Sequence, residues 1–500
     1  MTPTDTIPDE IWLHIALFAE LKALFALRLT CRKLSLLTHD RLIWIKHLQT
    51  MAHHDPIPPV TSRLLSPYYT CDSEREAGTS TVEAWCGYVR QTKNSWLNSR
   101  SASWPLNIEE ALDPGSGLQD KFPLTILSID VFRDRWLLVV YREKLLELWD
   151  LYPQLSTGLH PDALNTHPSE SVCRVRVQNP RLAEGTSCAS TLTADGTTLV
   201  VGVTGDPSVT LLFRFPLDFS NAGRIRAYTV TEYQTPSQLH QIRTLSPETN
   251  IIIFSRLHAV TVMHMETHEA WLVSAEEDDE ETWNGVIGAI PLIERQLLCV
   301  KAHSVEFMTC MQSEATPIAD PNIIRHRLAP STTFRSVSFS TPCVTQDGDD
   351  TSVSVTFLAY DSLHGIYNYR VIADFVSSSF IPVKMTLELL AVHEMAQLTA
   401  TTRAGYTPGA RAFVSACALG LQGRRGVWVQ RKRNSMERAL YAFTMDPNRE
   451  AKEGEAAPIE EKLIYVENSF DLRDDITHCA FAESTGLVIL GKRSGELLVV

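Results

Sequence analysis

The chain begins with the stretch "TDTIPDEIWLHIALFAELKALFALRLTCRKLSLLTHDRLIWIKHL", residues 4–48, which is its most apolar helical segment. Apolar residues recur in it at intervals of three and four, which aligns them along one face of a helix. Pro8 and the two acids after it predict a helix start at about residue 8, because acids favour the positive end of the helix dipole. Polar residues at 38–40 predict a break and a cap, so we expect three short helices.

These helices cannot bury all their apolar surface among themselves. A unit of under about fifty residues makes too small a core to be comfortably stable alone. Two coverings are open at this point: the rest of this chain, or a helix of a partner protein, since exposed apolar patches of this size usually mark an interface.

Length and composition describe a folded protein of more than one domain. The chain has 500 residues, of which 44% are hydrophobic and 21% charged, as in globular proteins. Its formal net charge of -14 argues against nucleic acid or an anionic membrane as a general partner. Ten cysteines without a CxxC pair predict reduced thiols, and no stretch reaches the ~20 apolar residues of a membrane span. We therefore expect a cytoplasmic protein, a nuclear one, or one present in both compartments.

The segment from Ile7 to Trp44 resembles an F-box. The family pattern begins with Leu-Pro-x-Glu, continues through a Leu-rich helix and Val-Cys-Arg-x-Trp, and closes with a further Trp. Here Ile7-Pro8-Asp9-Glu10, Cys31-Arg32-Lys33 and Trp44 fall at these places without a gap. The sequence departs from the pattern at Ala16, Ala19, Thr30 and Leu34.

The resemblance implies docking onto a Skp-type adaptor, which links F-box proteins to a cullin scaffold and a ubiquitin-conjugating enzyme. Carried over by position, the adaptor contact would comprise Ile7, Pro8, Ile11, Ile15 and Leu24. The residues that hold the helices together or extend this contact would be Leu27, Cys31 and Trp44.

The rest of the chain divides in two. Residues 49–102 are polar or Pro-rich at first and then helical, with Trp85, Val89 and Trp96 as apolar anchors, so we interpret them as a helical linker. From residue 124, seven segments share one pattern of strand, polar break and Val/Ile/Leu-rich strand, with starts roughly 40 to 70 residues apart. The predicted domains are thus an F-box at 1–48, a linker at 49–102 and a β domain at 103–500.

The seven units predict a seven-bladed β-propeller. Radial repetition of short antiparallel sheets protects the edges of a long all-β chain, and we favour it over a pair of β-sandwiches. The segment "LLELWDL" (145–151) and "TADGTTLVVG" (193–202) resemble the WD40 pattern, although only Trp149-Asp150 keeps its dipeptide. The expected fold class is α+β multidomain: a three-helix F-box, a helical linker and a mostly antiparallel propeller.

The last unit offers only three strands before Val500. Its missing outer strand would leave a row of backbone groups unpaired. We expect the segment "SWPLNI" (103–108) to supply it.

The sequence shows no catalytic constellation, and we expect no cofactor or metal. The glycines of "GLQGRRG", Gly420, Gly423 and Gly426, fit neither a dinucleotide fingerprint nor a P-loop and predict a hairpin turn instead. His258, His264 and His268 lack zinc-ligand spacing, which favours ordinary strand histidines.

Two charge clusters remain. The acids at 276–281 predict a solvated loop. A local basic edge, which we name as the candidate substrate contact, comprises Arg424, Arg425, Arg431, Lys432 and Arg433. Clustered arginines bind anionic or phosphorylated segments, and they also simply guard exposed strand edges.

The function that these features indicate is that of a substrate-recognition subunit in a Skp-cullin-F-box ubiquitin ligase. The F-box would dock on the adaptor, and the propeller would bind a protein substrate that the sequence does not identify. The alternative is a propeller scaffold without ligase activity. A propeller hydrolase or lyase is disfavoured because no catalytic set is visible.

Overall fold

The structure is a computed structural model. The residues it describes are 7–61, 75–100, 103–106, 124–152, 161, 170–177, 184–205, 209–217, 228–235, 240–273, 284–293, 296–309, 323–328, 332–347, 350–361, 364–376, 384–395, 412–432, 435–445 and 456–500. The predicted acidic loop at 276–281 and the predicted basic residue Arg433 lie outside these ranges.

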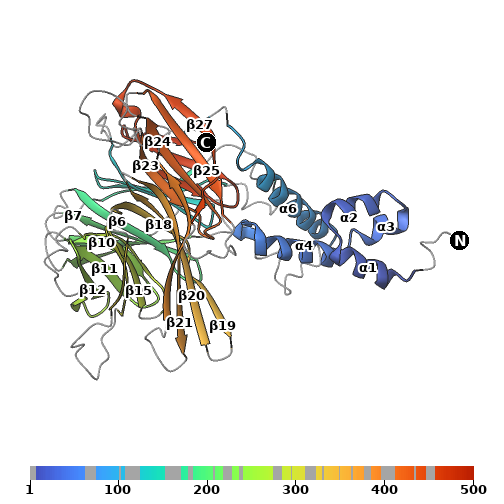
Figure 1. Cartoon of the computed structure of the whole chain (residues 1–500), viewed down its shortest axis with the longest axis horizontal. Coiled ribbons are helices and arrows are strands. Elements are labelled where there is room, and N and C mark those ends of the chain that lie inside the picture. The colour runs from blue at the N-terminus through green and yellow to red at the C-terminus, as the bar shows by residue number, and fades with distance from the viewer. Residues whose placement is uncertain are drawn as a thin grey trace.

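Helices form an arm that projects from the β domain (Figure 1). They are α1 (Asp9–Phe18), α2 (Leu21–Arg28), α3 (Arg32–Leu37), α4 (Arg41–His54) and α6 (Arg75–Ser95), with a short 3-10 helix η2 (Pro59–Thr61). The second expected helix is divided in two, because Cys31 takes an extended conformation with φ -160°. The predicted cap before α4 is confirmed: the Asp40 carboxylate accepts from the Leu42 N–H at 2.8 Å.

The β domain is a seven-bladed propeller, as predicted: the described residues form seven sheets, each built on antiparallel strands. Blade 1 has β2 (Ile126–Phe132), β3 (Trp136–Tyr141), β4 (Leu145–Asp150) and β5 (Glu170–Arg176). Blade 2 has β6 (Gly185–Leu192), β7 (Thr198–Gly205), β8 (Val209–Pro216) and β9 (Thr229–Gln234). Blade 3 has β10 (Gln241–Ser246), β11 (Ile251–Arg256), β12 (Ala259–His264) and β13 (Ala270–Val273). Blade 4 has β14 (Val286–Pro291), β15 (Gln296–Lys301), β16 (Ser304–Thr309) and β17 (Ile323–Arg327).

The last three blades are less regular. Blade 5 has β18 (Phe334–Phe339), β19 (Cys343–Asp347), β20 (Asp350–Asp361), β21 (Gly365–Val376) and β22 (Lys384–Glu394), joined by the parallel β26 (Ala457–Pro458). Blade 6 has β23 (Ala412–Leu419), β24 (Arg425–Lys432), β25 (Glu437–Thr444) and β27 (Glu461–Asn468). Blade 7 has β28 (Ile476–Ala482), β29 (Leu487–Lys492) and β30 (Leu497–Val499), preceded by the 3-10 helix η8 (Leu472–Asp474).

The outer strand of blade 7 comes from the other end of the chain. β1 (Trp104–Pro105) pairs antiparallel with β30, with Trp104 opposite Val499. The Leu106 N–H also donates to the Leu497 carbonyl at 3.0 Å. This strand lies within the segment 103–108 and satisfies the edge of β30.

Continuous apolar strands are buried on both faces by neighbouring blades. Every residue of β3 is buried. Leu138 and Val140 belong to the core between blades 1 and 2, whereas Leu137 and Val139 face a second core on the opposite side. Alternation of side chains along a strand explains how one apolar run serves two cores.

Strand direction defines two ends of the propeller. The turns between first and second strands, such as 420–424 in blade 6 and 483–486 in blade 7, lie at one end. The connections from a fourth strand to the next blade, such as 469–475, lie at the opposite end, because successive strands are antiparallel. Arg424 in the first kind of turn donates to the carbonyls of Ala52 and His53 at the end of α4. We therefore call the two ends the arm face and the distal face.

The glycine-rich segment forms a hairpin turn, as predicted. Gly420 and Gly423 lie between β23 and β24, and Gly423 has φ +69°. A Cβ on Gly420 would overlap the side chain of Glu483. The turn therefore needs a residue without a side chain where Glu483 approaches.

Glu483 organises this turn from the neighbouring blade. Its carboxylate is 1% exposed and accepts the backbone N–H groups of Gln422, Arg424 and Arg425 at 2.6, 2.9 and 3.0 Å. Burial, reinforced by the nearby carboxylate of Asp134, raises the pKa of Glu483 to about 7. The turn that contacts the end of α4 is therefore held in place by one buried carboxylate.

We expect two glycine substitutions to change stability in opposite directions. Gly420→Ala destabilises, because its Cβ overlaps Glu483. Gly87→Ala, in α6 with nothing within 4 Å of the added Cβ, stabilises by about 0.5–1 kcal/mol. Urea unfolding of both variants measures the difference, and a Gly420→Ala protein as stable as the wild type would contradict the packing described.

Stability should also fall as pH rises towards 7. Free glutamate has a pKa near 4.3, so between that value and about 7 the folded protein binds more protons at Glu483 than the unfolded chain. The free energy of unfolding therefore decreases with pH in this window. We expect Glu483→Gln to reduce this slope between pH 5 and 7, measured by urea unfolding.

The matched control is Glu460→Gln, at an exposed position, which should keep the wild-type slope. An unchanged slope in Glu483→Gln would exclude Glu483 as its source.

Candidate functional site

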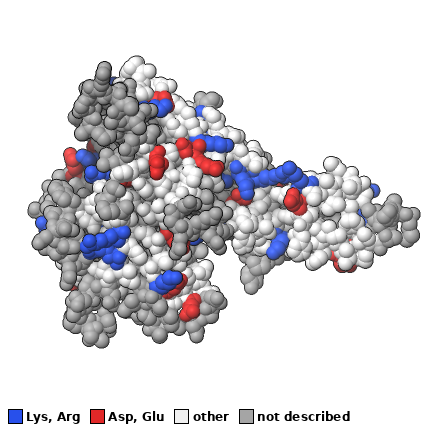
Figure 2. Space-filling model, viewed as in Figure 1, with Lys and Arg blue, Asp and Glu red and all other residues white. Residues whose placement is uncertain are grey.

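The arm concentrates exposed apolar side chains. Of the eighteen exposed large hydrophobic residues in the described part of the chain, seven lie between residues 11 and 42. Leu29 is 88% exposed and Phe18 75%. We call this group the arm's exposed apolar set; it comprises Ile11, Ile15, Phe18, Phe25, Leu29, Leu36 and Leu42. Figure 2 shows few charged side chains at the far end of the arm on the face drawn.

Other apolar residues of the same helices are covered by this chain. Leu24 and Trp44 are 1% and 0% exposed and share one core with Trp85 of α6. That core continues into the propeller, where Ile126 and Val499 belong to it. Of the two coverings left open by the sequence, packing on this chain accounts for one part of the helical surface. Another part is exposed.

The structure separates the residues predicted for adaptor contact into three groups. Pro8, Ile11 and Ile15 are exposed. Ile7, Leu27 and Cys31 are half-buried, and Leu24 and Trp44 are buried. The exposed group is available to a partner without rearrangement, and the buried pair holds the helices in place.

The departures from the F-box pattern fall mostly away from the exposed apolar set. Ala16 and Leu34 are 2% and 3% exposed, so they affect packing within the arm. Ala19 is half-buried and Thr30 is exposed.

Trp96, just beyond α6, fastens the arm to the propeller. Its ring stacks on Phe481 with centroids 5.6 Å apart. The guanidinium carbons of Arg100 and Arg425 lie 5.7 and 5.4 Å from the indole centroid. The Arg100 side chain also donates to the Val500 carbonyl at 2.6 Å. Aromatic stacking and cation–π contacts together fix the direction of α6.

The two predicted basic residues at the start of β24 belong to this joint. Arg424 donates to the carbonyls of Ala52 and His53 at 3.2 and 2.8 Å. Arg425 is 2% exposed and donates to the Glu483 carbonyl at 2.8 Å. Both guanidinium groups therefore serve the contact between arm and propeller.

The predicted residues at the other end of β24 lie at the distal face. Arg431 pairs with Asp475 and Lys432 with Glu437, each at 2.7 Å. An eight-residue strand is roughly 20–25 Å long, so the predicted basic residues do not gather into one edge. As a substrate contact, the cluster stays a prediction only for the residues at the distal face.

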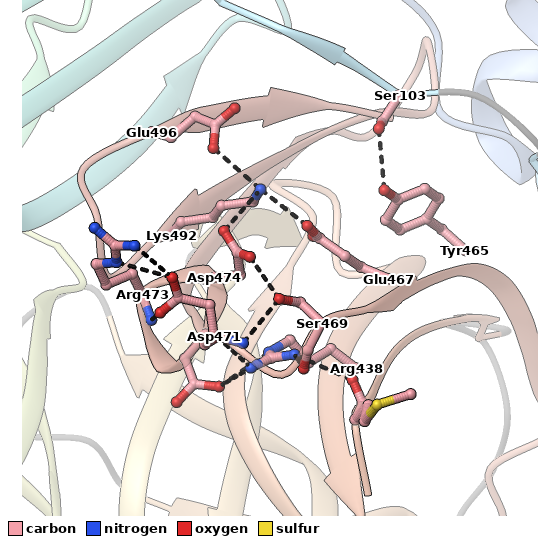
Figure 3. Close-up of polar contacts among 12 residues, drawn as sticks. Ser103, Arg438, Tyr465, Glu467, Ser469, Asp471, Arg473, Asp474, Lys492 and Glu496 are labelled. Atoms are coloured by element: carbon pink, nitrogen blue, oxygen red, sulfur yellow. Dashed lines mark hydrogen bonds and ion pairs between the residues drawn. The ribbon is translucent and has the colours of Figure 1, made fainter.

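A buried arginine organises the distal face of blades 6 and 7. Arg438, 2% exposed, pairs with Asp475 at 2.7 Å. It also donates to the carbonyls of Met436, Ser469 and Asp471 at 3.1, 2.7 and 2.9 Å (Figure 3). The loop 469–475 is thereby held against the end of β25.

Lys492 holds the same loop from blade 7. Its ammonium lies 2.9 Å from Glu467, 3.0 Å from Glu496 and 3.5 Å from Asp474 (Figure 3). Burial alone lowers the pKa of Lys492, but hydrogen bonds and charge attraction from Glu467 and Glu496 outweigh it, and the net shift is upward. The lysine therefore remains charged and paired.

Sequence reasoning missed the loop 469–475. Phe470 is 87% exposed and Leu472 56%. The available signal is the segment "SFDLRDD", in which two large apolar residues alternate with polar ones between two strands. A solvated connection does not require such residues.

The part of the chain that the structure describes contains neither a metal-type cluster of side chains nor a membrane-spanning helix. No group of three or more His, Cys, Asp or Glu side chains there has the arrangement of a metal site. No described helix is long and apolar enough to cross a membrane.

Comparison with known proteins identifies a family model for the N-terminal helices and lists solved structures that resemble the β domain. Residues 4–50 match the family model described as F-box-like. No curated protein matches the chain. Similar solved structures include the WD40 β-propeller domain of Doa1, with a TM-score of 0.38, 11% identity and coverage of 75% of this chain and 92% of that one. The WD40 domain of SCAP from fission yeast has a TM-score of 0.40, 8% identity and coverage of 75% and 84%.

The helices of the arm thus match the F-box-like family model and carry exposed apolar residues. The sheets that follow form a ring whose last blade is completed by β1, which precedes the first blade in the chain. The chain carries an F-box-like domain at residues 4–50, followed by a seven-bladed β-propeller.

Proposed function

We propose that this protein is the substrate-recognition subunit of a Skp-cullin-F-box ubiquitin ligase. The observation that carries the proposal is the arm's exposed apolar set, displayed by an F-box-like domain. F-box domains generally bind Skp-type adaptors, and propellers bind proteins. The chain itself would perform no covalent step.

The exposed apolar set suits a docking helix. Each large apolar side chain transferred from water into an interface contributes about 1.5–3 kcal/mol. Ile11 and Ile15 lie one turn apart on α1 and are 51% and 44% exposed, so they can contact one partner surface together. The buried residues Leu24 and Trp44 support this surface from behind.

The fixed contact between arm and propeller would set the distance between a bound adaptor and a bound substrate. The ring of Trp96 and the guanidinium of Arg424 fix the helices to the arm face. A substrate bound at the distal face would be held at a set distance and direction from the adaptor. Such fixed geometry raises the effective concentration of substrate lysines near a charged conjugating enzyme.

The test is co-purification of the full-length chain with a Skp-type adaptor and a cullin from cell extract. The wild type should retain both. Ile11→Asp with Ile15→Asp should retain at least about tenfold less adaptor, because burying an unpaired carboxylate costs more than ~1.4 kcal/mol.

The matched control is Leu272→Asp, which places an acid at an exposed apolar position of blade 3, where the leucine is 63% exposed. It should retain the adaptor fully, and all variants should unfold at wild-type temperatures. Adaptor retained by the double variant would rule out this surface. Adaptor bound without cullin would favour the scaffold function over the ligase.

A further inference from the structure

A continuous surface joins three segments at the distal face of blades 6 and 7. We call it the distal platform; it consists of Met436, residues 469–475 and residues 493–494. Backbone hydrogen bonds connect its parts: Ser469 N–H to Met436 at 3.2 Å, Arg493 N–H to Asp475 at 2.8 Å and Ser494 N–H to the Arg473 carbonyl at 2.9 Å. The three segments are therefore linked by hydrogen bonds into one unit.

The platform is rigidly supported from below. The Arg438 guanidinium makes hydrogen bonds to Asp475 and to three carbonyls. The Ser469 hydroxyl donates to Asp474 at 2.6 Å, and the Asp471 carboxylate caps η8 by accepting from the Arg473 N–H. A loop fixed in this way loses little conformational freedom on binding a ligand.

This supported loop displays large apolar side chains to water. Phe470 is 87% exposed, Leu472 56% and Met436 36%. Aromatic residues on preorganised surfaces commonly supply much of the energy of protein interfaces. Apolar residues gathered on a fixed loop therefore indicate a contact surface for another protein.

The cations of the platform are more exposed than the carboxylates that pair with them. Its most exposed ions are cations: the side chains of Arg473 and Arg493 are 78% and 59% exposed. The carboxylates that pair with them lie deeper, since Asp471 is 40% and Asp475 8% exposed. An approaching partner therefore meets guanidinium groups beside the apolar side chains, on a protein whose net charge is -14.

We propose that the distal platform binds an unphosphorylated acidic segment of another protein, in which Asp or Glu flanks a large apolar side chain. The apolar side chain packs on Phe470 and Leu472, and the carboxylates meet Arg473 and Arg493. Its identification as the substrate site rests on the proposed ligase function, whereas the binding itself does not.

The paired carboxylates favour a monoanion over phosphate. Asp471 lies 2.7 Å from Arg473, and Asp475 lies 3.6 Å from Arg493. Each guanidinium charge is therefore already shared, and its remaining attraction for an anion is weak. The cost of desolvating an ion grows with the square of its charge, so a weakly attractive site offsets this cost less well for a dianionic phosphate than for a carboxylate. A carboxylate carries half that charge, and the apolar contact supplies the remaining affinity.

The test measures binding of short fluorescent peptides to the full-length chain by fluorescence anisotropy. The probe peptide carries two central leucines flanked by glutamates in a Gly/Ser background. Three matched peptides replace glutamate by glutamine, glutamate by phosphoserine, or leucine by serine. We expect the probe to bind at least about tenfold more tightly than each of the three.

Variants locate the binding site. Phe470→Ser should weaken probe binding by about tenfold or more, and Arg473→Ser should weaken it less and reduce its salt dependence. The matched controls Leu257→Ser and Arg256→Ser change exposed residues at the distal end of blade 3 and should leave binding unchanged.

Three results would overturn the inference: no binding of the probe, preference for the phosphoserine peptide, or equal loss in the blade 3 variants. Adaptor co-purification and probe binding, both measured on the wild-type chain, separate this inference from the ligase proposal. A wild type that retains the adaptor but does not bind the probe overturns the platform alone, and one that binds the probe but not the adaptor overturns the ligase function alone. Phe470→Ser should retain the adaptor at the wild-type level.

Discussion

The architecture depends on one apolar core that the helices and the propeller share. Trp44 of α4 and Trp85 of α6 are fully buried in it, together with Ile126 and Val499 of the ring. The helices lack enough residues for a core of their own, so they gain stability by completing this one. Their orientation is then set by the ring, and the apolar residues left outside form the surface that we propose for docking.

Buried carboxylates organise both ends of the propeller by different means. At the arm face, Glu483 accepts backbone N–H groups and shapes a turn. At the distal face, the Asp475 carboxylate pairs with the guanidinium groups of Arg431 and Arg438 and fixes the loop 469–475. In each case several donors satisfy a carboxylate that would otherwise be buried without partners. The two faces are thereby made rigid independently of each other.

Local patterns in the sequence predict the ring and the N-terminal helices well. Turn residues between apolar runs locate the blades, and Trp85 and Trp96 are the anchors that their spacing indicates. Which helical residues face a partner depends on tertiary contacts, and so Leu24 and Ile11 look alike in sequence but differ in burial. Arg425 and Arg431 are close in the sequence, which suggests a single basic edge. They lie near the two ends of one strand, and these ends are at opposite faces of the propeller.

Completion of blade 7 by β1, which precedes the first blade in the chain, also affects the order of folding. Arg100 contacts Val500, 400 residues later in the chain. At about 5–20 residues per second, synthesis of that interval takes roughly 20 to 80 s. During this time the helices have emerged from the ribosome but lack part of their core. An early-bound adaptor or a chaperone would shield their apolar side chains from aggregation until the ring closes.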